Sequence, residues 1–338
     1  MALFFPHPEA PAAKQALQLH PDIKWLRSPL PYSLDHINCY LLRDGDGWCI
    51  VDTGMNNDAA RQNWLDVIEA ELEGAPITRV FVTHHHPDHV GLAGWLCDSR
   101  RIRLFMTQTE YLYAAAFGGA PRSQPFWEAS AYFDENGIAD SDRKIILGNT
   151  DYTHLVSELP GSFHQLLDKE TIKIGSHHWE AITTGGHAPE HLCLYCADLD
   201  ILISGDQVLP GITSNVSVTP IQPTANPLQH WLDAHAEVEA RVPDSVLVLP
   251  AHQLPFTGLH ERLNAVVEHH HERLDALQAL CDQPRTAQQL TTRLFKRELD
   301  TFQNFMAVGE CVAHLHYLLH QKRINRVLTD GVYWYRQC

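Results

Sequence analysis

Apolar residues gather first in a block of short strand-like runs near the N-terminus, with helical periodicity between them. Runs of β-branched and aromatic residues predict strands, and an apolar stripe at helical spacing predicts an amphipathic helix. The predicted strands are Ile37–Leu42, Trp48–Val51, Arg79–Val82 and Ile102–Phe105. The predicted helices are Asp58–Leu72 and one that opens within Gly91–Cys97.

Strand-like runs and helical periodicity occur again in a second block further along the chain. Its predicted strands are Thr171–Ile174, Trp179–Thr183, Leu192–Ala197, Ile201–Ser204 and Val246–Leu249, and its predicted helices are Leu228–Glu239 and Leu259–Leu280. Two strand-rich blocks, each with helices, predict an α+β fold in which two sheets pack together and helices cover both outer faces.

Between the blocks, from Tyr111 to about Asp168, the periodicity weakens and aromatic residues stand among glycine and proline. We interpret residues 111–168 as a helical insertion on the strand scaffold. It is either a lid over a site or an ordinary packed surface excursion, and the pattern leaves both readings open.

The pattern of hydrophobic and polar positions changes again after Gln283-Pro284. Thr286 is a predicted helix N-cap, Ala307–His320 a predicted amphipathic helix, and Asp330-Gly331 a predicted hairpin turn between two β-rich runs. Helices followed by a hairpin predict a winged-helix-like domain over residues 284–338, after a catalytic domain over residues 1–283.

Charge narrows the class of partner. The 338 residues carry a net charge of −16, which disfavours binding to nucleic acid. From Arg285 to the end, eight Lys or Arg face four Asp or Glu, a net of +4 that leaves −20 for the rest and supports a boundary there. The chain has no apolar run of 18 residues, no signal-like N-terminus and eight scattered cysteines. We therefore expect a cytoplasmic protein with no membrane partner.

Histidine is unusually frequent, at 23 residues, and a dense cluster follows the strand at Arg79–Val82. The run Thr83-His84-His85-His86-Pro87-Asp88-His89 offers imidazole and carboxylate donors that suit zinc, manganese or iron. Four donors are too few for two ions, and further ones follow three later strands, each beside a small residue: His187, Asp206 and His252.

These seven donors predict two metal sites. We assign His84, His86 and His187 to one divalent ion, and Asp88, His89 and His252 to the other, with Asp206 bridging. Two such ions, for which we favour Zn²⁺ over Mn²⁺ or iron, lower the pKa of a water between them and favour hydrolysis. Asp88 is the predicted catalytic residue, because it can orient that water and carry its proton.

Other candidate ligands are set aside. His85 points away from its neighbours in the simplest loop geometry. Cys193 and Cys196 lie three apart on a predicted strand, so their side chains face opposite ways and we expect buried thiols. His269–His271 falls within a predicted helix, where a solvated face explains it.

The donor pattern H-x-H-x-D-H, followed by single His, Asp and His, resembles the metallo-β-lactamase-fold superfamily over about Leu26–Leu280. That resemblance implies an αββα sandwich with its site at one edge. Val51-Asp52-Thr53-Gly54 matches a further motif of the family, which implies that Asp52 supports the metal-binding loop. The tail is similar to that of the β-lactamase-like protein 2 group. Some relatives there cleave single-stranded RNA, whereas glyoxalase II-like relatives hydrolyse thioesters.

Three functions remain open. The favoured one is a hydrolase that acts on a small activated acyl substrate, such as a thioester or lactone. The second is a nuclease for single-stranded RNA or another phosphodiester, and the third is a winged-helix binding protein with a regulatory metal site. We expect a small-molecule substrate, and a homo-oligomer is left open.

Overall fold

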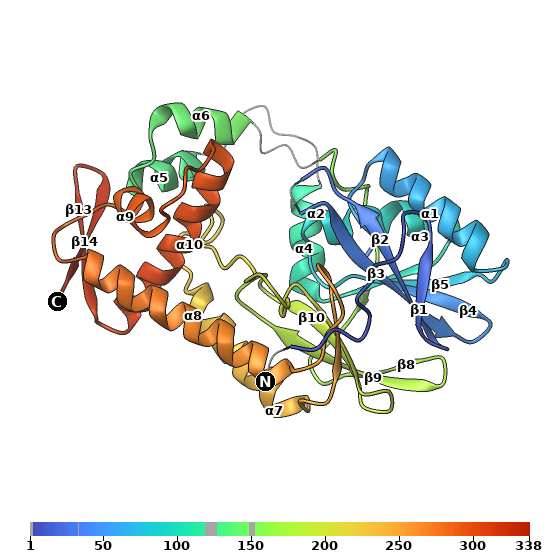
Figure 1. The fold of residues 1–338 in the computed structure, drawn as a ribbon. Coiled ribbons are helices and arrows are strands. Elements are labelled where there is room, and N and C mark those ends of the chain that lie inside the picture. The colour runs from blue at the N-terminus through green and yellow to red at the C-terminus, as the bar shows by residue number, and fades with distance from the viewer. Residues whose placement is uncertain (1–2, 33, 119–126, 149–152) are drawn as a thin grey trace. The chain divides into compact units, whose positions relative to one another are not determined.

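The computed structural model describes residues 3–32, 34–118, 127–148 and 153–338. Contacts divide the chain into two compact units (Figure 1). The first unit comprises Met1–Ala120, Tyr152–Ser214 and Glu237–Leu263, and the second Pro121–Asp151, Asn215–Ala236 and Asn264–Cys338. Residues 284–338 thus lie in the second unit together with earlier segments, and the predicted domain division at 283/284 stays a prediction.

The first unit contains a seven-stranded sheet in the simple order β1 to β7. Neighbouring strands are antiparallel from β1 to β4 and parallel from β4 to β7. The strands are β1 (Ala16–His20), β2 (Ile23–Pro29), β3 (His36–Asp44), β4 (Gly47–Val51), β5 (Ile77–Phe81), β6 (Arg103–Met106) and β7 (His164–Gln165).

A five-stranded sheet in the order β12-β11-β10-β9-β8 forms the other half of this unit. Its strands are antiparallel except for the parallel β11–β12 pair. They are β8 (Thr171–Ile174), β9 (His177–Thr184), β10 (His191–Cys196), β11 (Ile201–Gly205) and β12 (Leu247–Pro250).

Three apolar layers hold the first unit together. Side chains of β3 alternate, so that Cys39 and Leu41 pack with helices α1 (Asp58–Glu71) and α3 (Ala93–Arg100), while Tyr40 and Leu42 pack against the five-stranded sheet. A third layer joins the outer face of that sheet to the end of α7 (Pro227–Arg241) and the start of α8 (Leu259–Leu280). The predicted αββα sandwich is confirmed (Figure 1).

The second unit is mainly helical. It contains α5 (Trp127–Glu135), α6 (Asp140–Gly148), most of α8, α9 (Ala287–Leu294) and α10 (Thr301–His320), and a hairpin of β13 (Ile324–Thr329) and β14 (Val332–Gln337). Thr286 caps α9, as predicted. Helix α10 starts earlier than the predicted Ala307, because Asp300 and Gln303 form a second capping box. Among the described residues, no helix has the length and apolarity needed to span a membrane.

Candidate metal centre

The histidine cluster lies on the loop that leaves the carboxyl end of β5. Strand β5 ends at Phe81, and Pro87 opens the one-turn helix α2 (Pro87–Val90). Proline suits the first turn of a helix, because its ring fixes φ at a helical value and the N–H that it lacks would have no partner within the helix at that position. The backbone therefore turns between His86 and Asp88, and the loop presents its two pairs of donors in different directions.

The first group of donors is His84, His86, His187 and Asp206, whose ligand atoms all lie within 4.8 Å of one another. His84 Nε2 is 2.8 Å from His86 Nδ1 and 3.2 Å from His187 Nε2. His187 Nε2 is also 3.3 Å from Asp206 Oδ2. Strands β9 and β11 end just before His187 and Asp206, which brings these two donors to the same edge of the sandwich as the β5 loop.

The second group is Asp88, His89 and His252, which meets the same 4.8 Å criterion. Asp206 lies between the groups: its Oδ2 is 3.5 Å from His89 Nε2, and its Oδ1 is 3.3 Å from His252 Nε2. All seven predicted donors therefore converge in one cluster. The grouping differs from the prediction only in that Asp206 falls with the first group while touching the second.

The donors that face the centre fit a metal ion. Among the described residues, the buried atoms His89 Nε2 and Asp206 Oδ1 have no hydrogen-bond partner. His252 Nδ1 lies 2.8 Å from the carbonyl oxygen of His36, a bond that leaves Nε2 as the acceptor facing the centre. A buried polar atom without a partner costs free energy unless another group, such as a bound cation, satisfies it. The arrangement of these atoms thus suits divalent cations.

Burial and the neighbouring charges set the protonation states. Burial, reinforced by the adjacent His89, His86 and His187 rings, lowers the pKa of His84 well below its ordinary value. The imidazole is thereby held in the neutral form that binds metals. Burial raises the pKa of Asp206, but the neighbouring His252 and His89 outweigh it and hold that pKa well below its usual range. The carboxylate is therefore ionised.

Asp52 lies directly beneath the loop. Its Oδ1 accepts the backbone N–H of Thr83 at 2.8 Å, and its Oδ2 is 2.8 Å from His89 Nδ1. Burial lowers the pKa of His89, but Asp52, Asp206 and Asp88 together raise it well above its ordinary value. The contact orients the ring so that Nε2 faces the other donors, which is the geometry expected of a residue that supports the metal loop.

Gly205 shows why a small residue precedes Asp206. Its φ is +51°, and a Cβ there would lie 2.5 Å from His191 Nε2. That nitrogen accepts the backbone N–H of Asp206 at 3.1 Å. His191, which is fully buried, therefore fixes the backbone that carries the shared carboxylate.

Sequence reasoning missed Glu110, a fully buried carboxylate on α4 (Gln108–Phe117). Its Oε2 accepts the backbone N–H of His85 at 3.0 Å and lies 2.5 Å from His85 Nδ1. Its Oε1 accepts the backbone N–H of Glu190 at 2.7 Å. Glu110 thus ties the β5 loop to the segment that follows His187, and His85 indeed faces away from the centre.

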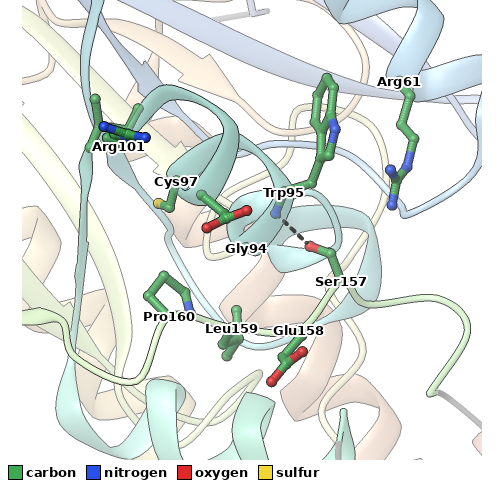
Figure 2. Close-up of a pocket in the computed structure, with 11 residues that line it drawn as sticks. Arg61, Gly94, Trp95, Cys97, Arg101, Ser157, Glu158, Leu159 and Pro160 are labelled. Atoms are coloured by element: carbon green, nitrogen blue, oxygen red, sulfur yellow. Dashed lines mark hydrogen bonds between the residues drawn. The ribbon is translucent and has the colours of Figure 1, made fainter.

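A separate pocket of about 610 Å³ lies elsewhere on the first unit, between α3 and residues 157–160 (Figure 2). Arg61, Trp95, Arg101 and Glu158 are among its lining residues. None of the seven converging donors lines it. We therefore place the chemistry at the donor cluster and not in this pocket.

Comparison with known proteins gives one consistent family. Residues 32–268 match the metallo-β-lactamase superfamily, and residues 274–338 match the C-terminal domain of metallo-β-lactamase-like proteins. A probable metallo-hydrolase of Bacillus subtilis, YqjP, is 23% identical over 328 residues, covering 93% of this chain and 98% of its own.

Solved structures agree with that result. A β-lactamase domain protein from Burkholderia ambifaria superposes with a TM-score of 0.92 at 38% identity, covering 99% of this chain and 98% of its own. A metallo-β-lactamase family protein from Thermus thermophilus superposes with a TM-score of 0.80 at 28% identity, covering 95% of this chain and all of its own. The prediction of a metallo-hydrolase is confirmed at this level, and the chain belongs to the metallo-β-lactamase superfamily.

Proposed function

We propose that the seven clustered donors bind two divalent ions, with Zn²⁺ favoured, and that the chain hydrolyses a small activated acyl compound such as a thioester or lactone. The observation that carries the proposal is the pair of donor groups that share Asp206. A single ion would leave one group of buried nitrogens without a partner. A carboxylate within reach of both groups can serve two adjacent cations.

When bound, such ions supply a water of lowered pKa and polarise the bond to be cleaved. The chain's own groups do the rest. Asp88, whose carboxylate is 3.5 Å from His252 Nε2, is placed to hold the attacking water and accept its proton. Burial raises the pKa of Asp88, but the neighbouring His89 and His252 lower it overall, so the carboxylate is ionised and ready to accept a proton.

Charge supports a small substrate over a polynucleotide. The whole chain carries −16, and the +4 of residues 285–338 is partly neutralised within the second unit. Arg323 pairs with Asp275 at 2.6 Å, Arg285 pairs with Asp282, and Arg326 stacks on Tyr333 at 4.0 Å. The two ion pairs offset two of the eight positive charges that a phosphate backbone would otherwise meet. A glyoxalase II-like activity therefore ranks above RNA cleavage.

We also propose that residues 284–338 form a winged-helix-like domain, on the basis of the order α9, α10 and the β13–β14 hairpin. The hairpin turns at Asp330-Gly331, both with positive φ, as a two-residue turn of this kind requires. Its role in this proposal is structural, because Leu290, Val312 and Tyr335 belong to the buried core of the second unit.

The decisive experiment is a substrate panel on chelated protein reconstituted with one metal at a time. We expect a thioester or lactone to be hydrolysed, the activity to vanish on chelation, and Zn²⁺ to restore it. Asp206→Ala is expected to lower turnover about 100-fold or more, since losing even a residue that only supports a ligand costs 10–100-fold. Asp46→Ala, on an exposed turn, is the matched control. Full turnover by Asp206→Ala would refute the shared-carboxylate centre, and hydrolysis of single-stranded RNA alone would refute the acyl substrate.

A further inference from the structure

A second group of metal-ligand side chains lies at the opposite end of the sandwich. Strand β9 runs from His177 to Thr184, and the antiparallel β10 runs from His191 to Cys196. Thr184 and His191 are at the edge that holds the candidate metal centre. His177 and Cys196 are therefore at the far edge, about 20 Å away along the strands.

At that far edge, ligand atoms of His177, Cys196 and Asp198 lie within 4.8 Å of one another. Imidazole, thiolate and carboxylate together form a donor set that selects zinc-like ions over magnesium or calcium. Cys196 is fully buried and Asp198 is exposed, so one side of the site is shielded from solvent and the other is open to it.

The surrounding residues orient these donors. Asp22, from the turn between β1 and β2 in the other sheet, places Oδ2 2.9 Å from His177 Nε2. The backbone N–H of Asp22 in turn donates to His20 Nδ1 at 3.2 Å, and the His20 ring lies edge-on to His177 at 6.2 Å. A carboxylate hydrogen-bonded to an imidazole is the usual support of a metal-binding histidine.

The sulfur of Cys196 also has polar partners. Burial raises the pKa of this thiol above its ordinary value, and hydrogen bonds from the backbone amides of Leu199 and Asp198 offset part of that rise. Amide donors aimed at a sulfur stabilise the thiolate that a metal needs.

We propose that His177, Cys196 and Asp198 form a structural metal site of the zinc type on the five-stranded sheet, at the edge remote from the catalytic centre, and that Asp22 links this site to the other sheet. Binding releases the thiol proton of Cys196 to solvent as the metal–sulfur bond forms. Three protein donors leave one tetrahedral position, which water fills. This inference is independent of the proposed function, since none of these residues belongs to the catalytic centre.

Cobalt(II) tests it directly, because thiolate ligation gives an intense near-ultraviolet charge-transfer band that nitrogen and oxygen ligands do not. The seven donors of the catalytic centre include no sulfur. We would titrate Co²⁺ into metal-free full-length protein carrying Cys338→Ser, which removes the exposed thiol. We expect the band to appear, together with one more bound equivalent than the catalytic centre takes.

Matched variants decide the outcome. Cys196→Ser should lose the band and one equivalent of Co²⁺, and should keep its hydrolytic activity. Cys193→Ser, which replaces a buried thiol of the same strand, should keep the band and the full number of bound Co²⁺ equivalents. Should Cys196→Ser fail to fold, Asp198→Asn at the exposed position should shift the titration of the band to at least about tenfold higher Co²⁺. No band in the parent protein, or an unchanged band in Cys196→Ser or Asp198→Asn, would overturn the proposal whatever the activity shows.

Discussion

Asp52 combines an unusual backbone with three contacts to the metal loop. Its φ is +59°, in the left-handed region that aspartate and asparagine tolerate better than other residues with a side chain. Its carboxylate receives the Thr83 N–H and hydroxyl as well as His89 Nδ1. An asparagine would keep the backbone conformation and lose one acceptor, which makes it an informative substitution.

We predict that Asp52→Asn lowers zinc affinity or turnover about 10–100-fold, because one amide nitrogen would face a donor in place of an oxygen. Competition with a chromophoric chelator measures the affinity, and Asp46→Asn on the exposed turn is the control. If Asp52→Asn binds zinc as tightly as the parent and turns over at the same rate, the carboxylate does not support the loop.

Glu110 gives a prediction about stability. Both of its oxygens accept backbone N–H groups, from His85 and Glu190, so either orientation of a glutamine amide sets an NH₂ against a donor. We predict that Glu110→Gln lowers the free energy of unfolding by about 1–3 kcal/mol. Glu128→Gln, at an exposed position on α5, is the comparison in urea unfolding. Equal midpoints for the two variants would contradict the prediction.

The seven donors were predictable from the sequence because each follows an apolar strand and strand ends meet at an edge. Asp206 is a clear case, because Ser204-Gly205-Asp206 directly ends a β-rich run. Glu110 was not predictable. It reaches the loop from helix α4, and its partners are backbone amides at positions 85 and 190, which leave no trace in the side-chain pattern.

At the scale of elements, the apolar runs predicted the buried strands and missed β1, β2 and the two-residue β7, which lies in the segment interpreted as a helical insertion. Strand β1 is an edge strand whose residues are all at least partly exposed, and β2 mixes Lys24 and Arg27 with apolar residues. Their strand conformation depends on pairing, of β1 with β2 and of β2 with β3, more than on an apolar pattern of their own. Strand β3 itself is buried on both faces, so its unbroken apolar run was easy to interpret.

Helices α8 and α10 are joined by a buried histidine pair. The expectation that His269–His271 form a solvated helix face is therefore wrong for His270, which is buried, and holds for the exposed His271. His270 Nδ1 lies 3.0 Å from His314 Nε2, and His314 Nδ1 donates to the carbonyl oxygen of Glu310. Trp231 packs against His270. Burial, and then His314 and His269, lower the pKa of His270 to about 2, and burial lowers the pKa of His314 to about 4. Both rings are neutral in the folded unit.

This pair predicts acid sensitivity of the second unit. Below about pH 6.5, the pKa of a histidine in the unfolded chain, the unfolded chain binds protons that the folded unit does not bind. This difference persists down to about pH 4 for His314 and about pH 2 for His270. Stability is therefore complete above about pH 6.5 and falls by about 1.4 kcal/mol per pH unit for each histidine. Hydrogen exchange of α10, corrected for intrinsic rates, measures it. His270→Gln should reduce the dependence of the unfolding free energy on pH by the equivalent of about one proton. His271→Gln, at an exposed position, should leave that dependence unchanged.

On the scale of the whole molecule, the change of composition after Gln283 located only the last part of the second unit. The rest comes from Pro121–Asp151, Asn215–Ala236 and the end of α8, which share one buried core with residues 284–338. Tyr132 and Trp231 illustrate this, because both belong to the same buried core as Leu290 and Leu315 of the tail. A local pattern cannot reveal such a grouping, since it arises from contacts between distant segments.

All seven candidate donors, in contrast, belong to the first unit. A ligand that binds only the folded state at about 1,000 times its Kd stabilises that state by about 4 kcal/mol. We therefore predict that chelation speeds hydrogen exchange around residues 83–90, 185–191 and 205–208, and leaves α10 of the second unit protected as before. Removal of metal also leaves His89 Nε2 and Asp206 Oδ1 unsatisfied, which adds a local penalty to that loss. Equal loss of protection in both units would mean that the metal centre stabilises the chain as one cooperative body, and that the contact-based division does not describe its unfolding.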